Sequence, residues 1–512
     1  MDAMKRRRYV SCVTTGALGL ALIGLAACNS GESTPTAAPP APGGSAGFSG
    51  PLAFVNNTGD KTLSTVALKG DSGNAVVNAI EAAKFENVAL NDMQFSSGDW
   101  VFANLTAANK VATIDPLTAA TPVHEINLPA GTRPVHIYRD ANDGEVIWTM
   151  NDGDNAPGTT TPGDDVVNCA AQGGGSVTAM HNSHLGPGAT PPTVLRTICI
   201  LADGHHVTAF SGDGVPKRAF VSSEVSGEVA VIDDEESSGT YLQMIHRIDL
   251  CKTSKEATLP TPATCNPENP TGTVAFTPNN SGPHGIRWSK LTKKIYSIQE
   301  GYHEIVEIDP ATFTITNTFD LTGTPYTGYG ISPDGRVFLL RGETTAPQPQ
   351  AIKLGVIDLS AATPTIANLN IPELDGASNG SFLRGGSSFK FSPDGKRLYF
   401  LLGNSTEATV TKKDRLFAFD SSTLSATPPA LTLLPNGEIP LLQTGRHSMD
   451  VLVQGAGEAK YVVVSNNGAP GSVSIINAAD NAIKENVTVG ISPGALLVYQ
   501  PGAATAGNQA SN

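Results

Sequence analysis

Residues 331–341 read ISPDGRVFLLR, and residues 391–402 read FSPDGKRLYFLL. In both stretches a Pro-Asp-Gly turn precedes a basic residue and a short apolar run rich in strand-forming residues. A strand, a tight turn and a second strand together predict a β-hairpin. Because the hairpin recurs along the chain, the fold is expected to be built from repeats.

The second strand of this hairpin has eight copies, each a basic or polar start, an apolar run and then Asn, Ser, Gly or Glu. They are LAFVNN from Leu52, WVFANL from Trp100, EVIWTM from Glu145, RAFVSS from Arg218, KIYSIQ from Lys294, RVFLLR from Arg336, RLYFLL from Arg397 and KYVVVS from Lys460. Most are followed by a third strand that ends near an acid, as in EVAVIDD and EIVEID. Each unit is therefore a four-stranded antiparallel blade, and blades stacked radially predict an all-β fold, a β-propeller with eight blades.

The two ends of the repeat region are incomplete blades. LAFVNN from Leu52 is a second strand without an inner strand before it, and GALLVYQ from Gly494 is an unpaired last strand. We expect GALLVYQ to supply the missing inner strand, so that the N- and C-terminal strands close the ring in one blade. Closure removes the strand edges that an open sheet would expose to aggregation.

The combination of SPDGR, an S-V-x-V-I-D-like third strand and a Gly-Pro-His-Gly-like start resembles the YVTN-repeat family of bacterial extracytoplasmic β-propeller proteins. The clearest matches are residues 461–490 and 219–233, with fainter copies across residues 52–499. This resemblance implies a propeller exposed outside the cytoplasm. Seven blades are commoner in that family, so a count of seven stays open beside eight.

Two insertions depart from the repeat, NDGDNAPGTTTPGDDVVNCAAQGGGS in the third blade and CKTSKEATLPTPATC after the fourth. They hold three of the four cysteines that follow Cys28, which are Cys169, Cys199, Cys251 and Cys265. In an exported protein an even number of cysteines favours disulfides. Of the three possible connectivities, the two local pairs, Cys169–Cys199 and Cys251–Cys265, are the simplest.

The N-terminus has the order of an export signal. A basic cluster at residues 5–8 precedes a short apolar run that ends in Leu25-Ala26-Ala27-Cys28. These four residues resemble the lipobox of bacterial lipoproteins, which implies cleavage after residue 27 and lipidation of Cys28. A plain secretory signal and a twin-arginine signal at Arg6-Arg7-Arg8 are the alternatives. Because Asn29 stands where inner-membrane retention would favour Asp, the outer membrane is expected if the cell is Gram-negative.

The predicted domains follow from composition. Residues 1–27 are the signal peptide, and residues 28–50 are the lipidated cysteine and a flexible tether of Pro, Gly, Ser, Thr and Ala, which cannot bury enough apolar surface to fold. Residues 51–500 are the propeller, and residues 501–512 are a disordered tail. The cell envelope, with membrane attachment through the N-terminal lipid, is the expected location.

Charge argues against one class of partner. The full chain carries 33 basic and 47 acidic residues, a formal net charge of -14. Without residues 1–27 it carries 29 basic and 46 acidic residues, a net charge of -17. Nucleic-acid binding is not expected, because phosphate contacts need clustered Lys and Arg.

Four histidines come just before or at the start of inner strands in blades three, four, five and eight. They are His136, His206, His284 and His447. Such positions surround one mouth of the central channel, and Glu300 and His303 are expected on the same face. Imidazoles from several blades suit copper or zinc, so a metal site is one hypothesis. The alternative is that histidine here marks the repeat, capping a turn beside Pro and Gly.

Other polar motifs are weaker. His181 and His184 should be surface residues on the opposite face. His303–Glu307 has the letters of a zinc motif, but that motif needs a helix and this stretch reads as a strand. Acidic residues in the first insertion, Asp152, Asp154, Asp164 and Asp165, could bind calcium, although the loop departs from the EF-hand pattern and reads better as solvated.

The chain shows no specific catalytic motif, so no catalytic residue is assigned and an enzyme is not the first expectation. The leading hypothesis is a lipid-anchored binding or scaffold protein whose ligand, a small molecule, polymer or protein, meets one face of the ring. A copper- or zinc-binding propeller with a redox role is the first alternative. A lactonase-like hydrolase, suggested by the related propeller of cytosolic lactonases, is the second, and fold cannot choose among the three.

Overall fold

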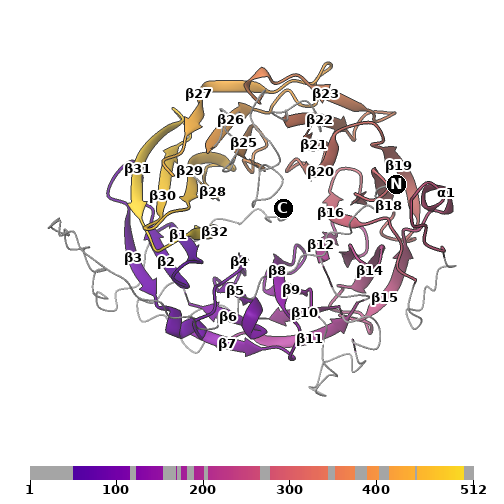
Figure 1. Ribbon diagram of the computed structural model, residues 1–512, viewed down its shortest axis with the longest axis horizontal. Helices are drawn as coiled ribbons and strands as arrows, with labels where there is room; N and C mark the ends of the chain where they lie inside the picture. The colour runs from indigo at the N-terminus through magenta and orange to yellow at the C-terminus, as the bar shows by residue number, and fades with distance from the viewer. Residues whose placement is uncertain are drawn as a thin grey trace, which may run out of the picture. The chain divides into compact units, whose positions relative to one another are not determined.

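The structure is a computed structural model that describes residues 50–115, 123–153, 169, 175–181, 190–200, 204, 206–265, 277–343, 352–374, 389–402, 414–443, 445 and 447–500. The predicted signal peptide, Cys28, the tether and the tail at 501–512 lie outside these residues. Within them, thirty-two strands form eight separate four-stranded antiparallel sheets. The sheets are arranged radially as an eight-bladed propeller, which confirms the predicted fold and the count of eight (Figure 1).

From the channel outward, the first four blades contain the following strands. Blade 1 has β32 (Pro493–Tyr499), β1 (Leu52–Asn57), β2 (Thr62–Ala67) and β3 (Ala75–Ile80). Blade 2 has β4 (Met93–Phe95), β5 (Val101–Leu105), β6 (Lys110–Ile114) and β7 (Val123–Asn127). Blade 3 has β8 (Pro134–Arg139), β9 (Val146–Asn151), β10 (Ser176–His181) and β11 (Thr193–Cys199). Blade 4 has β12 (His206–Ser211), β13 (Arg218–Ser223), β14 (Glu228–Asp233) and β15 (Met244–Asp249).

The other four blades repeat this order. Blade 5 has β16 (Pro283–Ser289), β17 (Lys294–Gln299), β18 (Glu304–Ile308) and β19 (Ile315–Asp320). Blade 6 has β20 (Tyr326–Ile331), β21 (Val337–Glu343), β22 (Ile352–Asp358) and β23 (Ile366–Leu369). Blade 7 has β24 (Phe389–Phe391), β25 (Arg397–Leu402), β26 (Arg415–Asp420) and β27 (Thr432–Pro440). Blade 8 has β28 (His447–Gln454), β29 (Glu458–Asn466), β30 (Ser472–Asn477) and β31 (Ala482–Thr488).

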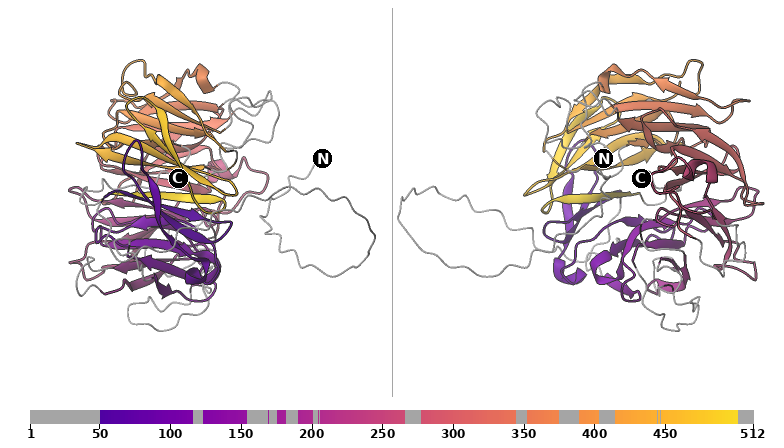
Figure 2. Two further views of the ribbon diagram at one scale, coloured as in Figure 1. Left: turned by 90° about the vertical axis from the view of Figure 1, so that its left-hand side faces the viewer. Right: turned by 45° about the vertical axis from the view of Figure 1, so that its right-hand side comes forward.

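Helical segments are short and lie between strands: η1 (Ala82–Phe85), η2 (Thr106–Ala108), α1 (Thr253–Glu256) and η4 (Pro372–Leu374). No helix in the described part of the chain has the length and apolar character needed to cross a bilayer. Seen from the side, the strands run roughly along the channel axis (Figure 2). The two ends of each inner strand therefore lie at opposite mouths of the channel.

The ring closes as predicted, through one blade made from both ends of the repeat region. β32 pairs antiparallel with β1, with Phe54 opposite Leu497 and Leu52 opposite Tyr499. Leu497 and Tyr499 belong to an apolar cluster with residues of blade 2, whereas Leu496 belongs to a cluster with residues of blade 8. β32 thus seals blade 1 against both of its neighbours.

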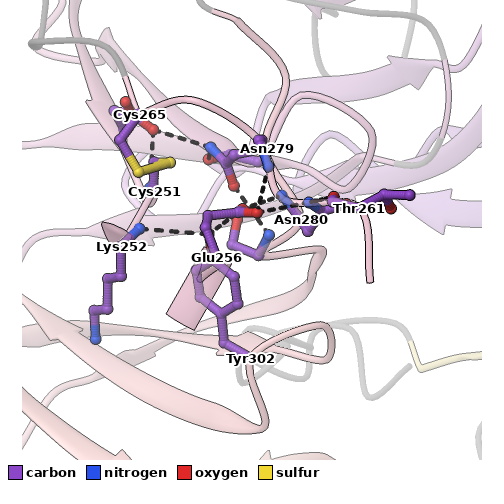
Figure 3. The surroundings of a disulfide bond; sticks show 12 residues. Cys251, Lys252, Glu256, Thr261, Cys265, Asn279, Asn280 and Tyr302 are labelled. Atoms are coloured by element: carbon purple, nitrogen blue, oxygen red, sulfur yellow. Dashed lines mark hydrogen bonds between the residues drawn. A yellow bond between two sulfur atoms is a disulfide. The ribbon is translucent and has the colours of Figure 1, made fainter. Parts of the chain in front are cut away.

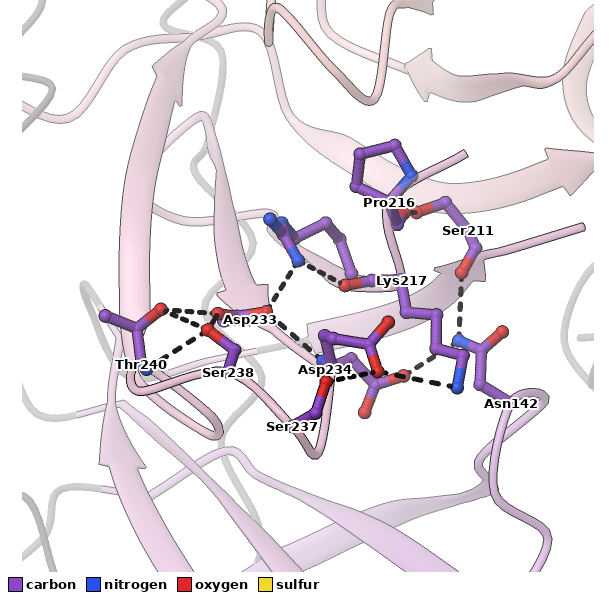
Figure 4. A network of polar contacts seen from close by, with 11 residues as sticks. Asn142, Ser211, Pro216, Lys217, Asp233, Asp234, Ser237, Ser238 and Thr240 are labelled. Atoms are coloured by element: carbon purple, nitrogen blue, oxygen red, sulfur yellow. Dashed lines mark hydrogen bonds and ion pairs between the residues drawn. The ribbon is translucent and has the colours of Figure 1, made fainter. Parts of the chain in front are cut away.

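The recurring basic and acidic residues of the repeat pair across strands. The base at the start of the second strand meets the acid at the end of the third, and the three pairs are Arg218–Asp233, Lys294–Asp309 and Arg336–Asp358. Asp233 also accepts hydrogen bonds from Ser238 and Thr240 in the following turn (Figure 4). The pairing of Lys294 lowers the pKa of Asp309 to about 2. These pairs help fix the register of each blade, because a slip of one residue would separate them.

The recurring asparagine has a related role. At the end of a second strand its side-chain amide donates to two hydroxyls of the third strand, at 2.8 to 3.2 Å, and the three instances are Asn57 to Thr62 and Ser64, Asn151 to Ser176 and Thr178, and Asn466 to Ser472 and Ser474. All three asparagines are buried. A buried amide needs such partners, so the motif holds the loop after the second strand at the channel mouth.

Both predicted disulfides are present, Cys169–Cys199 and Cys251–Cys265. The second closes the insertion between blades 4 and 5 (Figure 3). Beside it Glu256, which is 2% exposed, accepts hydrogen bonds from the Tyr302 hydroxyl at 2.5 Å and from the Asn280 side chain at 2.7 Å. The insertion is thus held against the propeller by a covalent bond and by a buried carboxylate.

Candidate functional site

The four predicted histidines lie where the sequence placed them. His206 and His447 are the first residues of inner strands β12 and β28, His284 is the second residue of β16, and His136 is the third residue of β8. All four therefore lie at the same mouth of the channel. His206 and His447 are buried, whereas the side chain of His284 is 40% exposed.

Each histidine is paired with a carboxylate. The pairs are His136 Nδ1 with Asp92 at 3.0 Å, His206 Nδ1 with Asp152 at 3.4 Å, His284 Nδ1 with Glu300 at 2.9 Å, and His447 Nε2 with Asp414 at 3.1 Å. A carboxylate beside one ring nitrogen fixes the orientation of an imidazole and favours its charged form. Glu300 lies on this face, as predicted.

Three of the pairs come together in neighbouring blades. The negative charge of Asp152, the partner of His206, also favours the protonated form of His136. The protonated forms of His136 and His284 repel each other. We call this group, His136, His206 and His284 with Asp92, Asp152 and Glu300, the imidazole arc. Its histidines come from blades 3, 4 and 5, and Asp92 adds a carboxylate from just before β4 of blade 2.

His447 is bound differently. Its two ring nitrogens contact the Ser465 carbonyl, at 3.0 Å, and Asp414, at 3.1 Å, and both contacts are buried. It therefore holds the start of β28 in place, which matches the expectation that histidine here can mark the repeat.

The carboxylates raise the pKa of two histidines. Burial opposes protonation of His136, but the hydrogen bond and the charge of Asp92 outweigh it, so the pKa of His136 is raised. For His284 the hydrogen bond to Glu300 is the largest influence, and it raises the pKa against the opposing effect of burial. These two imidazoles keep their protons to a higher pH than an ordinary histidine does.

Two acids of the arc, Asp152 and Glu300, share with Glu224 a position in the repeat that sequence reasoning missed. Asp152, Glu224 and Glu300 each come directly after the second strand of blades 3, 4 and 5. Glu224 adds its charge to the surroundings of His284. An acid at the same position in three consecutive repeats could have predicted from the sequence that carboxylates gather at this mouth of the channel.

Blade 6 brings an arginine to the same region in place of a histidine. The positive charge of Arg341, on β21, disfavours protonation of His284. The negative charge of Glu300 in turn favours the charged form of Arg341. A Cβ atom at Gly328 would lie 2.6 Å from Arg341 Nε, so a larger residue at this position of inner strand β20 would displace the arginine side chain. Burial, and then the nearby Arg287, lower the pKa of Arg341 to about 10.

The metal hypothesis has one feature in its favour and one against it. His206 is fully buried, and its Nε2 has no hydrogen-bond partner among the residues that the structure describes, which is unusual for a buried polar atom. Yet within the same residues no three His, Cys, Asp or Glu side chains are placed to hold one metal ion. Binding of copper or zinc at His136, His206, His284 and His447 stays a prediction.

Two of the weaker motifs lie where expected, whereas Asp152, from the loop expected to be solvated, is only 12% exposed and lies beside His206. His181 ends β10, at the mouth opposite the imidazole arc, with its side chain 42% exposed and 3.2 Å from Glu145. His303 is exposed and the residues after it form β18, so this stretch is a strand and no helical zinc motif. His184, Asp154, Asp164 and Asp165 lie outside the described residues.

Neither a search of protein-family models nor a search of curated proteins gives a match for this chain. Solved structures do resemble it. The dihydro-heme d1 dehydrogenase NirN is 12% identical, with a TM-score of 0.53 over 90% of this chain and 76% of that one. AztD from Citrobacter koseri is 13% identical, with a TM-score of 0.48 over 88% and 98%. A proposed 6-phosphogluconolactonase from Bacteroides fragilis is 15% identical, with a TM-score of 0.47 over 88% and 98%.

At these identities the likeness shows the fold alone. The YVTN resemblance implied a propeller, and the propeller is confirmed. Membership of that family has no family-model match behind it and stays a prediction.

Proposed function

We propose that this chain is a lipid-anchored extracytoplasmic binding protein that takes a ligand or partner with cationic groups at the imidazole arc. The observation that carries the proposal is the arc itself, three histidine–carboxylate pairs contributed by blades 2 to 5 at one channel mouth. A site fixed on rigid inner strands needs little reordering to bind, so more of the contact energy appears as affinity.

The expected ligand charge follows from the acids. Asp92, Asp152, Glu224 and Glu300 place four carboxylates in this region beside the guanidinium of Arg341, and once the imidazoles lose their protons this excess of negative charge favours cations above the channel mouth. A bound cation also competes with the protons on His136 and His284. Binding should therefore strengthen as pH rises above the pKa of these imidazoles.

A thermal-unfolding screen tests the proposal with three probes, spermidine as cation, citrate as anion and glucose as neutral molecule. Spermidine alone should stabilise the protein, by about 2.7 kcal/mol at one hundred times its Kd. Glu300→Gln should reduce this effect, whereas Glu145→Gln, which alters the histidine–carboxylate pair of the opposite mouth, should not. Equal responses to all three probes would defeat the proposal.

A transition-metal protein is the second candidate, favoured by the buried Nε2 of His206. Neutral imidazole is a good ligand for copper and zinc. Purified protein would be loaded with each metal, desalted and analysed for metal content. His284→Ala should lose the metal and His181→Ala, a histidine of similar exposure, should keep it. Absence of both metals from the loaded wild-type protein excludes this candidate. The described residues contain no feature that favours the lactonase-like alternative.

A further inference from the structure

A cavity of about 360 Å³ lies at the opposite mouth of the channel from the imidazole arc. It is lined by the ends of inner strands, or the turns after them, in blades 3 to 7. Five blades can contribute to one cavity only near the axis of the ring. Its volume falls within the range of small-molecule sites.

The charged residues that line the cavity are mainly cationic. Arg287, Lys290 and Lys390 contribute positive charges, against the single carboxylate of Asp213. Lys390 is paired with Asp450, Asp213 lies 3.9 Å from Lys293, and Arg287 donates a hydrogen bond to the Ile286 carbonyl at 2.7 Å. The cavity thus has an excess of positive charge, whereas the chain as a whole has a net charge of -14. Cations gathered between low-dielectric walls attract anions strongly.

Four aromatic residues of the core, Phe210, Trp288, Phe389 and Phe391, also border the cavity. Phe389 lies across β20 because Gly330 has no side chain, since a Cβ atom there would be 2.3 Å from the ring. Behind this ring the Arg341 guanidinium lies 5.7 Å from its centroid. The same glycine-rich strand, β20, thus admits both an aromatic wall and a second guanidinium.

Between Arg287 and Arg341 there is mutual repulsion, and it contributes to the lowered pKa of Arg341. A carboxylate or phosphate bound in the cavity could receive paired N–H···O hydrogen bonds from the planar guanidinium of Arg287. The rings would meanwhile contact the apolar part of the ligand.

We propose that this cavity binds a small organic anion, a carboxylate or phosphate carried on an aromatic or apolar body, with Arg287 and Lys290 contacting the charged group and Trp288 and Phe389 the body. The cavity lies at the other mouth of the channel from the imidazole arc, and its test does not depend on the function proposed above.

Four probes of one shape test the charge requirement: benzoate, phenyl phosphate, benzyl alcohol and benzylamine. Binding to the full mature protein would be measured by ligand-detected NMR and calorimetry at low and at physiological salt. Benzoate and phenyl phosphate should bind at least tenfold more tightly than benzyl alcohol, and benzylamine should bind least. The preference for anions should weaken as salt rises.

Two variants and a control locate the site. Lys290→Ala changes an exposed side chain and should weaken anion binding about threefold to tenfold, and Arg287→Met should weaken it further if the variant folds. Lys396→Ala removes a 68% exposed lysine on the same face but outside the cavity and should leave affinity unchanged. The proposal is overturned if the four probes bind equally, if no anion binds, or if Lys290→Ala and Lys396→Ala have the same effect.

Discussion

Truncation of Leu497 to Ala tests whether β32 closes the ring. Leu497 is 6% exposed and packs in the apolar cluster that joins blade 1 to blade 2. The change removes three carbon groups, at about 0.8 kcal/mol each, or about 2.4 kcal/mol of transfer free energy. The cavity left behind adds to this, so we expect the free energy of unfolding to fall by about 3 to 4 kcal/mol.

Ile491→Ala is the matched control. It deletes a similar aliphatic side chain two residues before β32, but Ile491 is 43% exposed, so the loss should stay within about 0.5 kcal/mol. Urea unfolding would be followed by tryptophan fluorescence, which reports on buried Trp100, Trp148 and Trp288. A lower urea midpoint is expected for Leu497→Ala alone. If the two variants unfold at the same midpoint, β32 does not pack as the closing strand and the reasoning fails.

Three further predictions concern charge, covalent bonds and location. Asp92→Asn should destabilise the protein more at pH 6 than at pH 9, because Asp92 raises the pKa of His136. The stability that comes from this raised pKa is present below the unfolded-state pKa and is lost as pH rises through the folded-state pKa, so equal losses at the two pH values in urea unfolding would contradict the prediction. Replacing Cys251 and Cys265 by Ser should lower stability by about 3 kcal/mol, as expected for a closed loop of this size, and peptide mapping without reduction should recover the linked pair from the wild-type protein. Cys28→Ala should release the protein from the membrane fraction or leave the signal uncleaved, and normal attachment of that variant would refute lipidation.

Much of the candidate site could be predicted from the sequence. The four histidines share a position relative to the inner strands, and position in a repeat decides which mouth a residue faces. The carboxylate after the second strand obeys the same rule and was open to prediction. The difference between His206, in the arc, and His447, bound by Asp414 and the Ser465 carbonyl, was not, because it depends on side chains from neighbouring blades.

The sequence by itself determined the all-β propeller fold and the closing strand and favoured eight blades over seven, because turn chemistry and apolar patterning are local and are repeated along the chain. The structure decided the count of eight. The local disulfides also followed from spacing. Only the tertiary structure decided the surroundings of Arg341 and Phe389, which depend on the room left by Gly328 and Gly330 on another strand. It also revealed the cationic cavity, since its residues come from five blades and converge only when the ring is closed. Contacts of this kind join chain segments that are far apart in sequence, so a local sequence pattern cannot predict them.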